Sequence, residues 1–309
     1  MFKRITYKDV LYEWLENKRK TNKESTYLKY LSIIDTHIIN TLGTINFKKL
    51  KPSDIISFFN SDEIDILSNS SKNIILIVIN SSINYGIERK YRKSFDNVDL
   101  RFKKDKNELT YFTLKEQKIL EEYIYSNMNI KTLPILVSLY TGARIGEICG
   151  LKGSDIDFVN NNISINRTVQ RVKNIDGDSK TKLVIGKPKT KSSIRIIPVP
   201  EFIINLLKQY VKDKDNYVFT GTNKPKDPRT LEKYFTNLLK KLNLKSLNFH
   251  TLRHSYSTRL REQKVDIKVI SILLGHANWK ITQDTYVHAS LDSIRQSVNN
   301  LYLYTQKGS

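Results

Sequence analysis

Several residue types that would indicate other classes of protein are scarce in this sequence. Its one cysteine, Cys149, lies on an apolar helical stripe, so we expect a core residue, no disulfide framework and a reducing compartment. The longest uninterrupted apolar run is residues 74–79, far short of the roughly 20 residues that a membrane-spanning helix needs. The N-terminus reads Met-Phe-Lys-Arg and then an amphipathic stretch, without the apolar centre of a signal peptide. We therefore expect a cytoplasmic protein with no membrane partner.

Acidic residues are also few, because Asp and Glu number 31 against 52 Lys and Arg. The formal net charge is +21 and the sequence pI is near 9.7. A positive field of this size favours a polyanion, and phosphate contacts that release counterions give affinity for DNA of any sequence. A length of 309 residues suggests two domains, each able to bury its own core.

Histidine is the third scarce type, yet all but one of the five histidines fall between residues 250 and 288. His250, Arg253 and His254 are spaced at i, i+3 and i+4, which places them on one face of a helix. After a break at Gly275, the same stretch contains His276, Tyr286 and His288. A tyrosine accompanied by His and Arg in a basic chain indicates attack of a phenolic oxygen on a phosphodiester, which joins the protein covalently to DNA.

These residue types match the demands of that reaction. In-line attack spreads negative charge over the non-bridging phosphate oxygens, and Arg donates bidentate hydrogen bonds to them while staying charged. A free phenol has a pKa of roughly 10, so only about one in 10³ is ionised at neutral pH. Cationic surroundings and an imidazole that accepts its proton would activate it. A Lys or a protonated His would supply the proton to the leaving 5′-oxygen. Such a set requires no metal and no nucleotide cofactor.

A further arginine lies upstream, in residues 139–151, which read LYTGARIGEICGL. An apolar helix is interrupted at Gly142, and Arg144 precedes a second short helix with an apolar face. Together, TGARIGEICGL, HTLRH and LLGHxxxxxTxxxY resemble the three signature boxes of the tyrosine recombinase (phage integrase) family. The boxes occur in the family's order and span residues 139–288. The surrounding sequence also fits from about residue 109 to the end.

The resemblance implies a role for each matching residue. Arg144 and Arg253 would hold the scissile phosphate. His250 and His276 would flank it as hydrogen-bonding or proton-transferring groups. Tyr286 would be the nucleophile, and whether it serves its own active site or a neighbour's stays open, although we expect its own.

Two more family residues are a carboxylate and a lysine. The acidic residue near the first arginine matches Glu147, which would orient that arginine rather than react. The lysine belongs to a β-hairpin between the first two boxes, where this sequence reads VIGKPKTKSSIRIIPVP. Lys189, followed by Thr190, fits the family's pattern best. Lys187 and Lys191 remain alternatives, because the hairpin differs in length among relatives.

The two histidines of the second box could instead form a metal site. His250 and His254 have helical H-x₃-H spacing, but the glutamate of H-E-x-x-H is missing and no cysteine is near. Arg253 would also repel a cation. We therefore predict no metal, and we interpret His254 as structural.

The first hundred residues predict four or so amphipathic helices. Residues 71–91 are ambiguous, because a β-branched run competes with helical spacing, and we favour a helix. Ser53 is the expected cap of a helix that starts around it. Residues 101–107 read as a charged linker. We therefore expect a helical core-binding domain that clamps DNA in residues 1–107, and a catalytic domain in residues 108–309.

Beyond the first box the sequence period becomes that of strands. We expect a small antiparallel sheet that carries the lysine hairpin to the minor groove, and then helices from Pro200 and over 227–242. The expected strands are residues 156–159, 163–165, 169–172, 182–185 and 194–199, with a short strand or extended segment at 216–220.

The fold class we predict is mainly α with a small antiparallel β-sheet, in two domains. The predicted function is site-specific DNA recombination of the integrase or excision type, in a mobile element, through a 3′-phosphotyrosyl intermediate. A Xer-like chromosome or plasmid resolvase, a type IB topoisomerase-like enzyme and a non-catalytic DNA-binding module are the alternatives. The resemblance implies a tetramer on two duplexes, an accessory directionality factor, and a place in the bacterial cytoplasm with the nucleoid. The tail, residues 290–309, would dock on a neighbouring protomer or fold back on its own domain.

Overall fold

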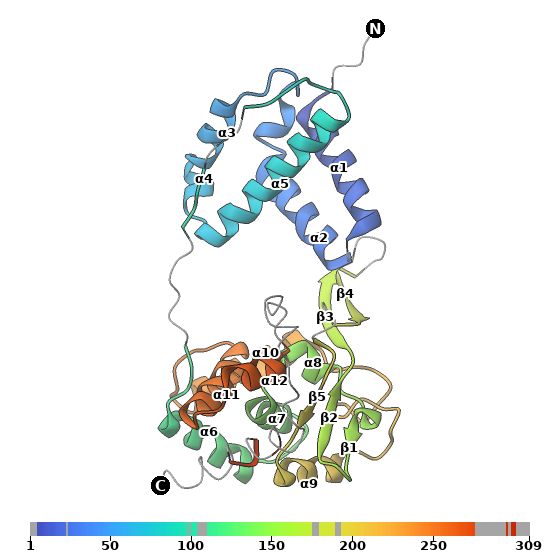
Figure 1. Ribbon diagram of the computed structural model, residues 1–309, viewed down its shortest axis with the longest axis vertical. Helices are drawn as coiled ribbons and strands as arrows, with labels where there is room; N and C mark the ends of the chain where they lie inside the picture. Colours follow the sequence, from blue (N-terminus) through green and yellow to red (C-terminus); the bar gives the residue numbers. More distant parts are fainter. Residues whose placement is uncertain are drawn as a thin grey trace. The chain divides into compact units, whose positions relative to one another are not determined.

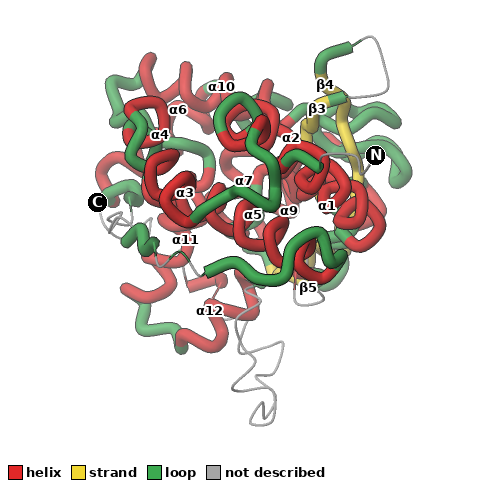
Figure 2. Tube along the Cα trace, turned by 90° about the horizontal axis from the view of Figure 1, so that it is seen from above, coloured by secondary structure: helices red, strands yellow, loops and turns green. Residues whose placement is uncertain are grey.

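The chain forms two compact units, Met1–Glu108 and Leu109–Ser309. Helices account for most of the structure and strands are few, as Figures 1 and 2 show, so the predicted fold class is confirmed. Within the part of the chain that is described, no helix is both long and apolar enough to cross a bilayer. This computed structural model describes residues 5–22, 24–96, 98, 100–103, 110–174, 179–188, 193–275, 295 and 298–300.

Among the described residues of the first unit, the regular elements are helices, and one isolated bridge joins Thr6 and Asn46. Helix α1 is amphipathic, as expected, and buries an apolar stripe from Tyr7 to Leu15 that packs against α5. The phenolic oxygen of Tyr7 lies 2.8 Å from the hydroxyl of Ser82 on α5. The elements are α1 (Tyr7–Thr21), α2 (Glu24–Ile33), a π-helical turn (Ile34–Ile38), a 3-10 turn (Leu42–Thr44), α3 (Pro52–Phe59), α4 (Asp62–Asp65) and α5 (Asn69–Glu88).

Two sequence predictions in this unit have clear outcomes. The ambiguous segment is the helix α5, because its β-branched residues bury one helical face while Ile77 stays exposed. The predicted cap at Ser53 is wrong. Helix α3 starts at Pro52, and the backbone N–H of Lys51 donates to the carboxylate of Asp54 at 2.8 Å. A proline in the first turn and an acid at the third position define this start, so Ser53 lies inside the helix.

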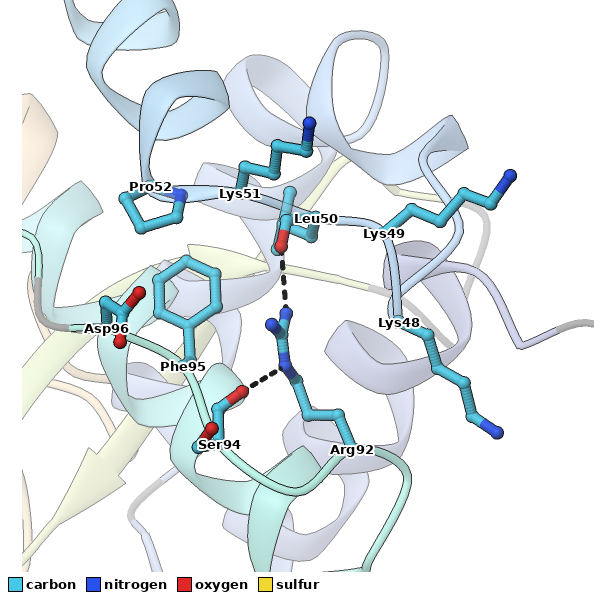
Figure 3. A pocket seen from close by; sticks show the side chains of 9 residues that line it. All are labelled: Lys48, Lys49, Leu50, Lys51, Pro52, Arg92, Ser94, Phe95 and Asp96. Carbon is cyan, nitrogen blue, oxygen red and sulfur yellow. Dashed lines mark hydrogen bonds between the residues drawn. The ribbon is translucent and has the colours of Figure 1, made fainter.

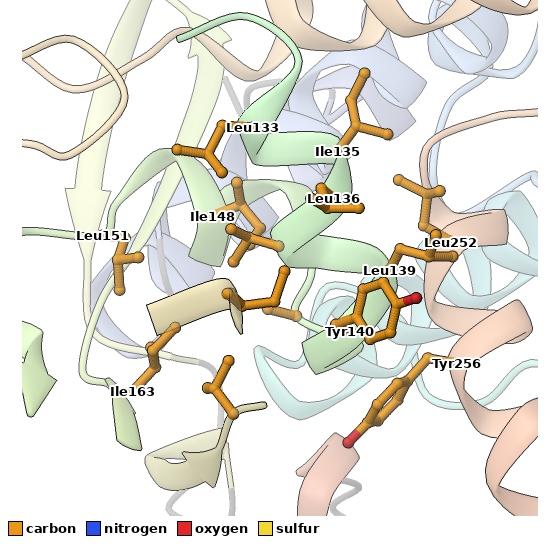
Figure 4. Close-up of a cluster of buried hydrophobic side chains, with 14 of the residues drawn as sticks. Leu133, Ile135, Leu136, Leu139, Tyr140, Ile148, Leu151, Ile163, Leu252 and Tyr256 are labelled. Atoms are coloured by element: carbon orange, nitrogen blue, oxygen red, sulfur yellow. The ribbon is translucent and has the colours of Figure 1, made fainter. Parts of the chain in front are cut away.

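The second unit is built around α7, in which every residue is buried. Helix α11 packs against α7, and side chains from α8, β2 and α11 surround it in Figure 4. Cys149 lies in this core, as predicted. The helices are α6 (Leu114–Ser126), α7 (Leu133–Thr141), α8 (Ile145–Cys149), α9 (Glu201–Tyr210), α10 (Pro228–Lys241), α11 (His250–Glu262) and α12 (Ile267–Leu274), with a 3-10 turn at Gly153–Asp155.

The strands form two antiparallel sheets rather than the single sheet that the sequence suggested. One sheet has the order β1–β2–β5, and the other is the hairpin β3–β4. Between β2 and β3, Arg167 donates to the carboxylate of Asp155 and to the carbonyl of Gly150. The strands are β1 (Ile156–Asp157), β2 (Asn162–Ile165), β3 (Thr168–Lys173), β4 (Thr181–Gly186) and β5 (Arg195–Pro198).

The strand or extended segment expected at 216–220 is a turn. Tyr217 forms isolated bridges with Lys152 and Thr222, and the N–H of Gly221 donates to the Tyr217 carbonyl at 2.8 Å. Gly221 has a φ of +66°, which favours glycine and closes the turn.

The described part of the tail contacts its own unit. Val298 is fully buried in the core around α7, and Nη2 of Arg295 donates to the carbonyl of Asn160 at 2.9 Å. These residues therefore pack in the way that a tail folded back on its own domain would.

Candidate active site

Arg144 is positioned by the turn that ends α7. Gly142 adopts a φ of +63°, and a Cβ there would lie 2.5 Å from the ring of Tyr256, so both the backbone and the space require glycine. Arg144 itself is extended and is the N-cap of α8, where its backbone N–H donates to Oε2 of Glu147 at 3.0 Å. The spacing of TGARIGE therefore folds into a left-handed turn followed by a carboxylate-capped helix.

Glu147 is nearly completely buried beneath two arginines. Its Oε1 accepts from Nη1 of Arg144 at 2.9 Å, and its Oε2 accepts from Nη2 of Arg195 at 2.9 Å. Burial alone would raise the pKa of Glu147, but the hydrogen bonds and charges of Arg195 and Arg144 outweigh burial and lower it. The carboxylate is therefore ionised at neutral pH and can hold both guanidinium groups.

Arg253 projects from α11 into the same cluster. Its Nη1 donates to the carbonyl of Gly142 at 2.8 Å, and its Nη2 donates to the carbonyl of Leu274 at 2.6 Å. The residue is 3% exposed. Burial and the charges of Arg144 and Arg195 lower the pKa of Arg253 to about 9, which still leaves the group charged at neutral pH.

His250 and His254 lie on the same helix as Arg253. Their rings meet edge to face, with centroids 4.6 Å apart. His250 is exposed in the first turn of α11, whereas His254 is half-buried. Burial and the neighbouring Arg253 lower the pKa of His254, so it is neutral at pH 7 and packs as a neutral ring.

The structure thus brings together the described members of the predicted set. Arg144, Glu147 and Arg253 share one cluster, and Arg144 is the most accessible, with 37% of its side chain exposed. His250 lies one helical turn before Arg253. Three other predicted residues, Lys189, His276 and Tyr286, lie outside the described residues, as does the alternative Lys191. The alternative Lys187 is exposed just after β4.

Arg195 is a member of the cluster that the sequence interpretation missed. It opens β5 and is 8% exposed, and its Nε donates to the carbonyl of Leu273 at 2.6 Å. A signal was available, because alternate residues of a strand face opposite sides. Ile194 and Ile196 are exposed, so Arg195 shares the inner face with Ile197. A charged residue at an inward position of a strand indicates a buried partner.

Tyr256 is the phenol that packs among these arginines in the described structure. It is 0% exposed, and burial raises its pKa although the charges of Arg195 and Arg253 act in the opposite direction. Its hydroxyl has no hydrogen-bond partner within the described ranges. A phosphodiester could not reach this oxygen, so proximity to arginine does not make Tyr256 a nucleophile.

Three guanidinium groups and one carboxylate give this cluster an excess of positive charge. A bound phosphodiester would offset it, and Arg144 offers the exposed donors for such a contact. No group of three or more His, Cys, Asp or Glu suited to a metal ion occurs among the described residues.

The first unit contains a basic pocket of about 330 Å³. Arg92 lines its floor and donates to the carbonyls of Phe47, Leu50 and Ser94 at 2.7–3.1 Å. Figure 3 shows that the ammonium groups around this pocket point away from Arg92. The charged rim therefore faces outward, where an anion could approach it. The lining residues are Lys48, Lys49, Leu50, Lys51, Pro52, Arg92, Ser94, Phe95 and Asp96.

Comparison with known proteins identifies both units. The model of the phage integrase family matches residues 113–292, and that of the phage integrase N-terminal SAM-like domain matches residues 6–61. The chain is 30% identical over 317 residues to a "Tyrosine recombinase XerC-like" of Caldanaerobacter subterraneus subsp. tengcongensis, which covers 93% of this chain and 80% of that protein. It is also 30% identical over 185 residues to the "Transposase from transposon Tn916" of Enterococcus faecalis, covering 54% of this chain and 44% of that one.

A solved structure of the Tn1549 transposon integrase, in complex with transposon right end DNA, shares the fold. Its TM-score is 0.76 at 22% identity, with 96% of this chain and all of that one covered. Together, these matches define the class of the protein, which is a site-specific tyrosine recombinase. Within that class, the chain belongs to the phage integrase family.

Proposed function

We propose that the chain cleaves and rejoins DNA through Tyr286. Its phenolic oxygen would attack the phosphorus, a 3′-phosphotyrosyl bond would form, and the bond to the 5′-oxygen would break. The phenolic proton would leave and the 5′-oxygen would gain one. A 5′-OH from the partner duplex would then reverse the step. The bond energy is kept in the linkage, so strand exchange would need no external energy source.

The observation that carries this proposal is the arginine cluster and its place in the chain. Arg144 and Arg253 lie around Glu147, and Arg253 also binds the carbonyl of Leu274, the last residue of α12. The sequence continues from there into His276 and Tyr286. The cluster would hold the two non-bridging oxygens of the phosphate, on which negative charge grows during attack.

Proton transfer would fall to imidazole and lysine. His250 is exposed beside Arg253 and could accept or donate a hydrogen bond at the phosphate, and His276 would flank the other side. Lys189 would protonate the leaving 5′-oxygen. β4 and β5 bracket the segment that contains it, with Lys187 and Lys191 as the alternatives.

The two units would have different roles on DNA, one in binding and the other in catalysis. The first, predicted as residues 1–107, would clamp the duplex through outward lysines such as Lys48, Lys49 and Lys51. The second, predicted as residues 108–309, would carry the chemistry. The net charge of +21 supports DNA as the partner.

Integration or excision of a mobile element is the biological role we propose. The Tn916 transposase supports it, being a transposon protein that is 30% identical to this chain over 185 residues. Resolution of chromosomes or plasmids is the second candidate, because the XerC-like relative matches 93% of the chain. In either role, two sites would require four protomers, and integration could involve an accessory directionality factor. In that tetramer, the tail beyond residue 300 would dock on a neighbouring protomer. Such a protein would work at the nucleoid of a bacterial cytoplasm.

A nicked suicide substrate that carries the cognate site tests the chemistry. The wild-type protein should form a covalent adduct that survives denaturation, and Tyr286→Phe should bind without forming it. Tyr256→Phe is the matched control, because it removes a buried hydroxyl that has no partner in the described structure and should leave adduct formation intact. Tight binding without an adduct in the wild type would favour a DNA-binding module. Relaxation of supercoils without exchange between sites would favour a topoisomerase.

A further inference from the structure

Arg195 joins three elements of the catalytic unit through four hydrogen bonds. From the start of β5, its Nε donates to the carbonyl of Leu273 on α12 at 2.6 Å, and its Nη1 donates to the carbonyl of Ser193 at 3.0 Å. Its Nη2 and Nη1 donate to the two carboxylate oxygens of Glu147 on α8, at 2.9 and 3.3 Å. The side chain is almost fully buried while making these contacts.

Glu147 is therefore shared between two arginines in a symmetrical way. Its Oε1 accepts from Nη1 of Arg144 and from Nη1 of Arg195. Its Oε2 accepts from the backbone N–H of Arg144 and from Nη2 of Arg195. The side chain of Arg144 is partly exposed, so the direction of its guanidinium depends on its hydrogen bond to the carboxylate of Glu147. Arg195 holds that carboxylate in place through its own hydrogen bonds.

The other end of this network is the C-terminus of α12. The last carbonyls of a helix have no partner within the helix, and cations are favourable there. Arg195 takes the carbonyl of Leu273 and Arg253 takes that of Leu274, just before Gly275 ends the helix at a φ of +65°. Two arginines of the cluster thus cap the helix from which the chain enters the third box.

We propose that Arg195 is a positioning residue for DNA cleavage. It holds Glu147, and through it Arg144, at a fixed distance from the end of α12, after which the sequence reaches His276 and Tyr286. Arg195 does not bind the phosphate. Instead, it sets the position of Arg144, which would bind the phosphate, relative to the end of α12, from which the chain continues to Tyr286. This inference rests on the proposed function.

A control is needed for the loss of any buried arginine. Arg259 on α11 provides it, because it is 3% exposed, pairs with Glu262 and donates to the carbonyl of Phe112. Arg259→Met removes a buried charge from the same unit without touching Glu147. A purely structural role of Arg195 would give the two methionine variants the same behaviour per folded molecule.

The experiment measures single-turnover cleavage of the suicide substrate and, separately, the Kd for the same DNA. Arg195→Met should slow cleavage about a hundredfold with Kd nearly unchanged, because a misplacement near 1 Å costs that much in rate. Arg195→Lys keeps the charge but loses the bidentate geometry, so its cleavage rate should fall between those of the wild type and Arg195→Met. It replaces the methionine variant as the test if that variant does not fold. Arg259→Met should cleave at the wild-type rate per folded molecule.

Two further readouts separate positioning from packing. In Arg195→Met the carboxylate of Glu147 loses two hydrogen bonds, so the acid limb of the cleavage rate should move to higher pH, and Arg259→Met should not move it. Combining Arg195→Met with Glu147→Gln should cost little more than the worse single change, because both act through one carboxylate.

The outcomes are distinguishable. An adduct in the wild type with equal slowing by Arg195→Met and Arg259→Met overturns the inference alone, as do additive effects of the Arg195 and Glu147 changes. No adduct in the wild type overturns the proposed function and this inference with it.

Discussion

Replacing Gly142 by alanine should destabilise the catalytic unit by about 2–4 kcal/mol. Roughly 1 kcal/mol would come from holding an L-residue at a φ of +63°, after allowance for the stiffer unfolded chain. About 1–3 kcal/mol more would come from overpacking. The new Cβ would meet the ring of Tyr256 at 2.5 Å and the side chain of Leu274 at 2.8 Å.

Gly221 offers the matched control for this prediction. It has a φ of +66°, but a Cβ there meets nothing within 4 Å. Gly221→Ala should therefore show the backbone cost without the steric one. Urea unfolding of both variants, followed by fluorescence, gives the difference directly. Equal losses of stability would refute the reasoning, because they would mean that the turn before Arg144 has room for a side chain.

Two other predictions concern charge. The pKa of Glu147 is below its ordinary value, so its contribution to stability is complete above about pH 4.5 and is lost as the pH falls through the lowered pKa. The stability gap between wild type and Glu147→Gln should thus narrow on acidification, and a gap that stays constant in unfolding curves from pH 7 to pH 3 would contradict this. Replacing Lys48, Lys49 and Lys51 by alanine should weaken binding to all duplexes alike, and should reduce the slope of log K against log salt by roughly 0.9 for each phosphate that these lysines neutralise. An unchanged slope in anisotropy titrations would remove these lysines from the DNA interface.

Much of the helical structure could be predicted from local patterns. The buried stripe of α1 repeats every three to four residues, and Asp227 caps α10 just where a helix start was expected. The core character of Cys149 followed from its neighbours in the same way. Such features depend on residues close in sequence, which a single chain displays directly.

Features that depend on distant partners were harder to predict. The separation of the strands into two sheets depends on distant pairings, because β2 pairs with β5 and places Ile163 opposite Ile197. The Arg195–Glu147 pair spans 48 residues, and nothing local reveals its partner. Family motifs named Arg144 and Arg253, but the hydrogen bond from Arg253 to the Gly142 carbonyl, 111 residues away, required the fold.

The burial of α7 bears on which parts of the enzyme can move. All nine of its residues are buried, and the turn that carries Arg144 follows its last residue directly. Local opening of such a segment approaches the free energy of global unfolding. Backbone amides of α7 should thus be among the slowest to exchange with deuterium. Arg144, which follows α7, would keep its position in the catalytic unit while other elements move. Any rearrangement during the proposed strand exchange must then occur in elements with looser packing.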